Sequence, residues 1–165
     1  MALTLRNVDV DPDAPLDTWP YEALVTLIER GSVTDWARLT AHVKEQPWGV
    51  VARQVQDYLA YERPVGLAPL LERTIAAART AQERRERADV AARVDELIRR
   101  SGLTTAEFAS RIGTSRSRLS TYRTGSVTPS AALLLRMERL VERLGHAQAR
   151  LARPSWPGQG DESVL

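Results

Sequence analysis

The sequence predicts an all-α protein made of two small helical domains. In segment after segment, apolar residues recur three, four and seven positions apart, the spacing that places them on one side of an α-helix. Residues that cap or stop helices, chiefly Ser, Thr, Gly and Pro, separate these segments. Between Leu70 and Ser101 neither Gly nor Pro occurs. A helix can therefore run without interruption through the middle of the chain.

The amino-terminal part is expected to be a helical domain preceded by a short lead. Residues 1–18 are expected to be extended or loop, and residues 19–76 to form the domain. Three of the four tryptophans, Trp19, Trp36 and Trp48, fall within this part of the chain. Large rings so close together favour a core of their own.

Four amphipathic stripes predict four helices in this domain. Pro20 fits the first position of the first helix, which ends near Gly31, and Thr34 or Asp35 fits the cap of the second. The residues expected to point inward are, helix by helix, Leu24, Leu27 and Ile28; Trp36, Leu39 and Val43; Val51, Val55, Tyr58 and Leu59; and Leu67, Leu70, Leu71 and Ile75.

Three further segments complete the predicted organisation. Residues 77–88 hold strong helix formers and almost no large apolar side chain, so they predict a solvated helical connector. Residues 89–152 form the second domain. Its last helix has an apolar seam up to Leu151, which is a candidate for dimerisation or for packing on the amino-terminal domain. Residues 153–165 contain two prolines and two glycines and are expected to have no fixed structure.

The strongest local pattern is a pair of short helices in the second domain. Thr104 and Glu107 have the spacing of a capping box, and Gly113 stands where the first helix must stop. Ser115 can cap the second helix, which Gly125 ends. The expected inward residues are Phe108, Ala109 and Ile112 in the first helix and Leu119 and Tyr122 in the second.

The second short helix is predicted to expose a polar, basic face. If Leu119 and Tyr122 point inward, a turn of 100° per residue turns the opposite side toward solvent. That side holds Arg116, Ser117, Ser120 and Thr121, with Arg118 and Arg123 at its flanks. A basic, polar face of this kind is typical of a surface that contacts DNA phosphates and base edges, so the first four are the predicted base-reading residues. Arg116 is the best candidate reader, because its guanidinium can bond guanine O6 and N7 together, a pairing worth about 1–3 kcal/mol of discrimination.

Leu103–Leu140 resembles the Cro/C1 (Xre-type) helix-turn-helix family. The matching residues are Leu103, Thr104, Glu107, Ala109, Ile112, Gly113, Ser115, Leu119, Tyr122, Gly125, Pro129, Ser130, Leu133 and Leu140. The resemblance implies a bundle of about five helices, with Asp89–Gly102 as the first and the last starting at Ser130. The first helix has its own inward stripe of Val90, Val94, Leu97 and Ile98.

The resemblance also implies contacts to DNA phosphates for Thr105, Arg111 and Arg118 and for the backbone around Ser126 and Val127. Ser115 and Arg123 complete the predicted set of phosphate contacts. Two positions depart from the family pattern. Thr105 stands where the family has Gln, so the side chain that is expected to contact the DNA backbone is shorter. Arg123 and Thr124 stand where the family has Glu-Asn, and an arginine there is expected to strengthen phosphate attraction.

Charge and composition set the limits of the interpretation. Arginine is common throughout the chain, so its total is weak evidence of function; its distribution is more informative. Residues 1–80 hold 8 basic and 11 acidic side chains, a net charge of −3, whereas residues 81–165 hold 15 and 10, a net charge of +5. With no cysteine, no long apolar run and no visible signal peptide, the sequence favours a cytoplasmic protein without disulfides or membrane spans.

No catalytic or cofactor-binding pattern is found. His42 and His146 are the only histidines, and neither has a metal-spaced or nucleophilic partner nearby in the sequence. No glycine-rich phosphate loop of either common type is present. The sequence therefore predicts neither an enzyme nor a cofactor or metal site.

Two functional interpretations follow from these patterns. The first is a sequence-specific regulator of transcription, a homodimeric repressor that reads an inverted repeat in double-stranded DNA through Ser115–Thr124. The alternative is an antitoxin or similar regulator whose amino-terminal domain binds a protein partner while the helix-turn-helix controls its own operon. An exposed apolar patch around the three tryptophans favours the alternative, and complete burial of all three favours a self-contained domain.

Overall fold

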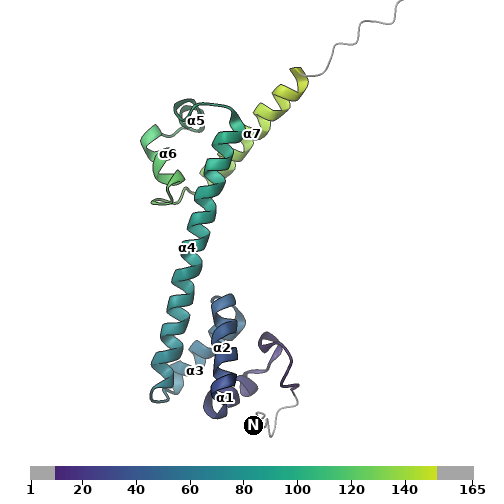
Figure 1. Cartoon of the computed structure of the whole chain (residues 1–165), viewed down its shortest axis with the longest axis vertical. Coiled ribbons are helices and arrows are strands. Elements are labelled where there is room, and N and C mark those ends of the chain that lie inside the picture. Colours follow the sequence, from purple (N-terminus) through teal and green to yellow (C-terminus); the bar gives the residue numbers. More distant parts are fainter. Residues whose placement is uncertain (1–9, 152–165) are drawn as a thin grey trace, which may run out of the picture. The chain divides into compact units, whose positions relative to one another are not determined.

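The computed structural model describes residues 10–151. Within that range the chain forms seven α-helices and one 3₁₀-helix and contains no strand, which confirms the all-α prediction. It divides into two compact units, residues 1–85 and 86–165, whose helices are labelled in Figure 1. The predictions made for residues 1–9 and 152–165 lie outside the described residues.

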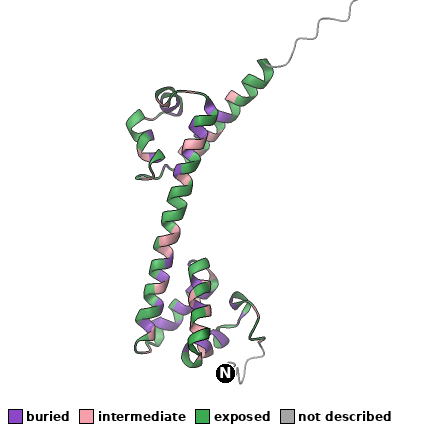
Figure 2. Ribbon diagram, viewed as in Figure 1, coloured by how far each residue is buried: buried purple, intermediate pink, exposed green. Residues whose placement is uncertain are grey.

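Unit 1 comprises a 3₁₀-helix at Leu16–Thr18, α1 (Tyr21–Arg30), α2 (Val33–Glu45), α3 (Val50–Tyr61) and the first part of α4 (Leu67–Ser101). Its core is one apolar cluster to which all of these elements contribute. Figure 2 colours the buried positions of these helices purple. Most predicted inward residues are buried there: Leu24, Leu27, Ile28, Leu39, Val43, Val51, Val55, Tyr58, Leu59, Leu71 and Ile75. The 3₁₀-helix, expected as loop, forms where Leu16 enters this core.

Two helix starts in unit 1 differ from the prediction. Pro20 lies just before α1 with extended backbone (ψ 156°), so it caps the helix and does not occupy its first turn. The cap of α2 is Ser32, not Thr34 or Asp35. Asp35 is instead the third helical residue, and its carboxylate accepts hydrogen bonds from the Ser32 backbone and hydroxyl. These bonds, led by the one from the hydroxyl, lower the pKa of Asp35.

Helix α4 is one uninterrupted helix, which confirms the prediction made from the absence of Gly and Pro between Leu70 and Ser101. It runs from residue 67 to residue 101 and includes the predicted connector, residues 77–88, as helix. Leu70, predicted to point inward, is 45% exposed. Leu71 and Ile75 are buried and lie on the side of α4 that faces the core. Leu70 lies about 100° around the helix from Leu71, and its side chain is therefore directed away from the core.

The three tryptophans of unit 1 have different environments. Trp19 is buried, whereas Trp36 is half-buried and donates from Nε1 to the backbone oxygens of Leu27 and Ile28, both at 3.2 Å. Trp48 is 52% exposed. The guanidinium of Arg79 lies 4.3 Å from the centre of the Trp48 ring. Complete burial of the three rings, which would favour a self-contained domain, is therefore not observed.

Unit 2 contains the remainder of α4, α5 (Thr105–Ile112), α6 (Arg116–Arg123) and α7 (Ala131–Leu151). Its described residues thus form four helices where the resemblance implied five. From residue 131 to 151 the chain has no proline and only Gly145 to weaken a helix, so α7 continues as one element. The last part of the predicted apolar seam, Ala147 and Leu151, is exposed.

The core of unit 2 joins all four helices. It contains Val94, Leu97 and Ile98 of α4, Phe108, Ala109 and Ile112 of α5, Leu119 and Tyr122 of α6, and Met137, Leu140 and Val141 of α7. Val90, also predicted to point inward, is only half-buried. The predicted inward faces of the two short helices are therefore confirmed.

Arg79 is expected to stabilise unit 1 through contacts that only a planar cation can make. Its Nε donates to the Pro47 oxygen at 3.1 Å and its Nη2 to Gln56 Oε1 at 2.8 Å, beside the contact with Trp48. Arg79→Ala should lower the free energy of unfolding by about 1–2 kcal/mol. Urea unfolding followed by the tryptophan fluorescence of the protein measures this loss.

Two controls make the Arg79 result specific. Arg79→Lys should recover little of the lost stability, because an ammonium group cannot donate from two nitrogens held in the fixed, planar geometry of a guanidinium. Arg53→Ala, at an exposed position of α3, should change the unfolding midpoint very little. Equal losses for Arg53→Ala and Arg79→Ala would contradict the role given to these contacts.

Candidate nucleic-acid interface

The start of α5 is fixed by the predicted capping box. The Thr104 hydroxyl accepts a hydrogen bond from the Glu107 backbone, and the Glu107 carboxylate accepts from the Thr104 backbone N–H at 2.9 Å and hydroxyl at 2.7 Å. These two bonds, the hydroxyl first, lower the pKa of Glu107, and the nearby charge of Arg111 adds to the effect. Thr105, a predicted phosphate contact, is the first residue of the helix and is half-buried.

The turn between α5 and α6 requires glycine at one position. Gly113 has φ 77° and ψ 38°, in the left-handed region that side chains with a Cβ disfavour. Its N–H donates to the Ser110 oxygen, and the Thr114 N–H donates to the Ala109 oxygen at 3.0 Å. These paired bonds end α5 and turn the chain directly into the next helix.

Helix α6 is oriented by two buried side chains. Leu119 is fully buried and Tyr122 is 4% exposed, while Ser115 caps the helix by accepting from the Arg118 N–H at 3.1 Å. Three of the four predicted base-reading residues lie on the exposed side: Arg116, Ser117 and Ser120. The structure therefore brings a free guanidinium and two hydroxyls together on the first turns of one helix.

Arg116 has no hydrogen bond or ion pair to any other residue in the range 10–151. The fourth predicted reader, Thr121, differs: it is half-buried and its hydroxyl donates to the Arg118 backbone oxygen at 2.8 Å. Its own backbone oxygen accepts from the Val127 N–H at 3.2 Å and from the Ser126 hydroxyl at 3.3 Å. The loop that holds Ser126 is thereby folded against α6.

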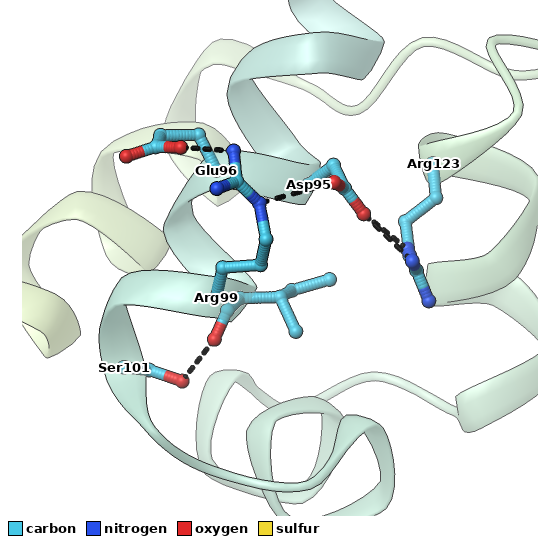
Figure 3. A network of polar contacts seen from close by, with 6 residues as sticks. Asp95, Glu96, Arg99, Ser101 and Arg123 are labelled. Carbon is cyan, nitrogen blue, oxygen red and sulfur yellow. Dashed lines mark hydrogen bonds and ion pairs between the residues drawn. The ribbon is translucent and has the colours of Figure 1, made fainter.

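Arg118 and Arg123, both predicted phosphate contacts, are engaged within the protein. Arg118 Nε donates to the Tyr122 hydroxyl at 2.9 Å, one helical turn away. Arg123 donates to Asp95 Oδ1 from Nε at 2.9 Å and from Nη2 at 2.6 Å, which links the end of α6 to α4 (Figure 3). The arginine that departs from the family pattern thus has a carboxylate partner.

Asp95 belongs to a wider polar network on α4. Its other carboxylate oxygen lies 3.5 Å from Arg99 Nε, and Arg99 also pairs with Glu96. At the end of the helix the Ser101 hydroxyl donates to the Ile98 oxygen at 2.7 Å (Figure 3). The same hydroxyl accepts from the Leu103 N–H at 3.1 Å. Ser101 is 3% exposed, so its hydroxyl connects α4 to the start of α5 from inside the unit.

Asp95, Ser101 and Arg136 also contribute to this region, although the sequence patterns did not predict a role for them. Arg136 Nη1 donates to the Ile112 backbone oxygen at 2.8 Å and so satisfies a carbonyl at the end of α5. The Asp95–Arg123 and Arg136–Ile112 contacts join residues more than twenty positions apart, and no local spacing marks such pairs. Ser101 lies beside Gly102, and that helix end was a signal that could have drawn attention to it.

Other candidate chemistry is limited in the described residues. His42 is half-buried, and its Nε2 has no hydrogen-bond partner there; His146 is exposed. Residues 10–151 contain no cluster of three or more His, Cys, Asp or Glu placed to bind a metal. Within the same range, no helix has both the length and the apolar character needed to cross a bilayer.

No family model, curated protein or solved structure matches this chain. The assignment to the Cro/C1 family accordingly stays a prediction from the residues of Leu103–Leu140.

The capping box predicts a pH-dependent stability for α5. Because the pKa of Glu107 is lower in the folded state, its contribution is complete above the unfolded value of about 4.3 and is lost as the pH falls through the folded value. Glu107→Ala should therefore increase hydrogen exchange of the α5 amides at pH 7. The difference from the unchanged protein should shrink as the pH falls below about 4.

Glu142→Ala, at an exposed position of α7, provides a matched loss of one carboxylate. It should leave exchange of the α5 amides unchanged at every pH. The role of the charged capping box would be contradicted if the difference in α5 amide exchange between Glu107→Ala and the unchanged protein stayed constant from neutral to acidic pH.

Proposed function

We propose that this protein is a sequence-specific regulator of transcription that binds double-stranded DNA through α6. One observation carries the proposal: Leu119 and Tyr122 are buried while Arg116, Ser117 and Ser120 are exposed on the opposite side of a short helix. That helix follows a capped partner helix across a tight glycine turn, the arrangement in which a second helix enters the major groove.

The chemistry of the exposed face fits DNA. Arg116 is free to bond a guanine through two nitrogens, whereas the serines can reach base edges only at close approach or through water. Arg111 is exposed in the last turn of α5. A contact from Arg111 to a phosphate would set position without reading sequence. Thr105 and Ser115, at the starts of the two helices, and Ser126, in the loop after α6, stay proposed phosphate contacts.

A homodimer is the assembly that fits this function. Two copies related by a two-fold axis would read half-sites about 34–36 Å apart, one turn of DNA, and the site would be an inverted repeat. The exposed end of the α7 seam, with Leu151 87% exposed, is the proposed contact between copies. Bound across a promoter in the cytoplasm, such a dimer would repress by occlusion, with no cofactor and no enzymatic step.

A second function is favoured by a separate observation. Trp48 is half-exposed in unit 1, which suits a surface that binds another protein. An antitoxin or related regulator would combine such binding with control of its own operon. The two functions are compatible, because they use different units.

Selection of genomic fragments by the purified full chain tests the proposed function. Performed at two salt concentrations, it separates counterion-driven binding from base reading, since the former weakens steeply with salt. A shared inverted repeat among fragments retained at the higher salt supports the regulator. Fragments no different from random would overturn it and leave the partner-binding function.

Arg116 and Arg111 are expected to differ in their effects on DNA binding. Arg116→Ala should flatten the base preference at one position of each half-site, with a loss of about 1–3 kcal/mol for the preferred base. Arg111→Ala should weaken binding to all sequences alike. Arg139→Ala, at an exposed position of α7, is the charge-matched control. Gel-shift titrations on a panel of single-base variants distinguish these outcomes, and an unchanged preference in Arg116→Ala would contradict its role.

Asp95 is expected to restrain DNA binding by neutralising Arg123. Asp95→Asn removes the charge and keeps an oxygen that can accept a hydrogen bond, so Arg123 becomes available to a phosphate. Affinity for all sequences should rise, and the slope of log K against log salt should steepen by about 0.9.

Glu138→Gln is the matched control for Asp95→Asn. Glu138 also pairs with an arginine of α4, Arg93, at 3.0 Å, so the control removes the same charge without touching Arg123. It should leave the slope as it is. Equal slopes for Asp95→Asn and Glu138→Gln would show that Arg123 does not reach a phosphate.

A further inference from the structure

A shallow groove of about 390 Å³ lies on unit 1. Its floor is made of short side chains and its rim of long ones. The floor consists of Thr74, Ala77, Ala78 and Ala81, and the rim of Lys44, Leu70, Arg73 and Arg85. The Thr74 hydroxyl donates to the Leu70 backbone oxygen at 2.9 Å, so this polar atom is already satisfied and the floor is effectively apolar.

The groove has the length and shape of a seat for a helix. All lining residues except Lys44 come from α4, and they recur three or four positions apart from Leu70 to Arg85. Fifteen residues of helix rise about 22 Å, or four turns. Alanines in the middle of such a stripe let a second helix approach to about 8 Å between axes.

A small molecule fits this surface less well. Sites for small ligands enclose about 70–90% of the ligand. Here one helix supplies the floor and both ends, and Lys44 is the single lining residue from another element. A compact ligand would therefore stay largely in water, whereas a rod could use the whole stripe.

The rim selects the charge of the occupant. Lys44 and Arg85 make no hydrogen bond or ion pair with other residues in the described part of the chain, and Arg73 donates only to the Pro69 backbone oxygen. No acidic residue lines the groove. Pairing of this surface with the same surface of a second copy would bring cations against cations, so the charges oppose self-association through it.

We propose that this groove docks an acidic amphipathic helix of a different protein. The helix would place small or aliphatic residues on the alanine floor and Asp or Glu along both flanks, opposite Lys44, Arg73 and Arg85. This interaction surface goes beyond the proposed function and does not depend on DNA binding, because it lies on unit 1 and needs no residue of α5 or α6.

A synthetic peptide tests the proposal directly. The probe is a fluorescent helix of about 18 residues, long enough for four turns, with Leu or Ala at i, i+4, i+7 and i+11 and Glu on both flanks. Its binding to the full chain is measured by anisotropy without DNA. Saturable binding is expected; its absence at millimolar protein or peptide would overturn the proposal, whether or not the chain binds DNA.

Charge reversal locates the binding surface. Lys44→Glu with Arg85→Glu should weaken the acidic peptide about tenfold, while Arg30→Glu with Arg53→Glu, exposed elsewhere on unit 1, should have little effect. A peptide with Lys in place of Glu should then bind the first double variant better than the unchanged chain. This gain cannot come from misfolding, and equal weakening by both double variants would overturn the site.

The floor is tested by a pair of neighbouring substitutions. Ala77→Trp fills the groove and should abolish peptide binding, whereas Ala76→Trp, exposed on another face of α4, should preserve it. Decanoate serves as the probe for a small amphiphile. If decanoate binds the groove more tightly than the peptide and displaces it, the surface is a small-ligand site and the proposal is wrong.

Discussion

The burial of Leu119 and Tyr122 is the constraint on which the proposed interface depends. These two residues fix the rotation of α6 about its own axis, and a helix of eight residues has few other means of being held. Rotation by one residue, about 100°, would replace Arg116 and Ser120 on the exposed face by their neighbours. Because both side chains belong to the same core as Phe108 and Met137, the rotation of α6 follows from the packing of the whole unit.

The arginines near α6 divide into those that the protein uses and those that it leaves free. Arg136 satisfies a carbonyl of α5, Arg123 pairs with Asp95, and Arg118 donates to the Tyr122 hydroxyl. Each of these three arginines orders a helix end or a side chain. The Arg123 side chain is 42% exposed, so its ion pair with Asp95 contributes at most about 1 kcal/mol to the stability of the fold. Arg116 orders nothing, which is why it is the most informative residue of the group.

The sequence predicts well the features that depend on neighbours three or four positions apart. The Thr104–Glu107 box, the Gly113 turn and the burial of Phe108, Ile112 and Leu119 follow from local spacing, and the structure confirms each. Errors arise where several local signals compete. At the start of α2, Ser32, Thr34 and Asp35 can all cap, and only the reciprocal bonds of Ser32 and Asp35 decide between them.

Contacts between distant parts of the chain could not be predicted. Asp95 and Arg123 are 28 residues apart, and Arg79 meets Pro47 and Trp48 across more than thirty positions. The same limit explains Leu70, whose apolar character predicted burial. Whether a side of α4 is covered depends on which other helices pack against it, and the apolar pattern of α4 alone does not predict those neighbours.

The two proposed surfaces attract the same sign of charge and differ in what lies beneath it. On α6 the apolar residues are buried, so the exposed face is polar throughout and its attraction to DNA is mainly electrostatic. On α4 the cations surround an alanine floor, so docking there would also remove apolar area from water. Salt should therefore weaken the first interaction steeply and the second only in part. A polyanion such as heparin, which offers charge without an apolar face, would distinguish the surfaces: it should compete fully for α6 and only partly for the groove.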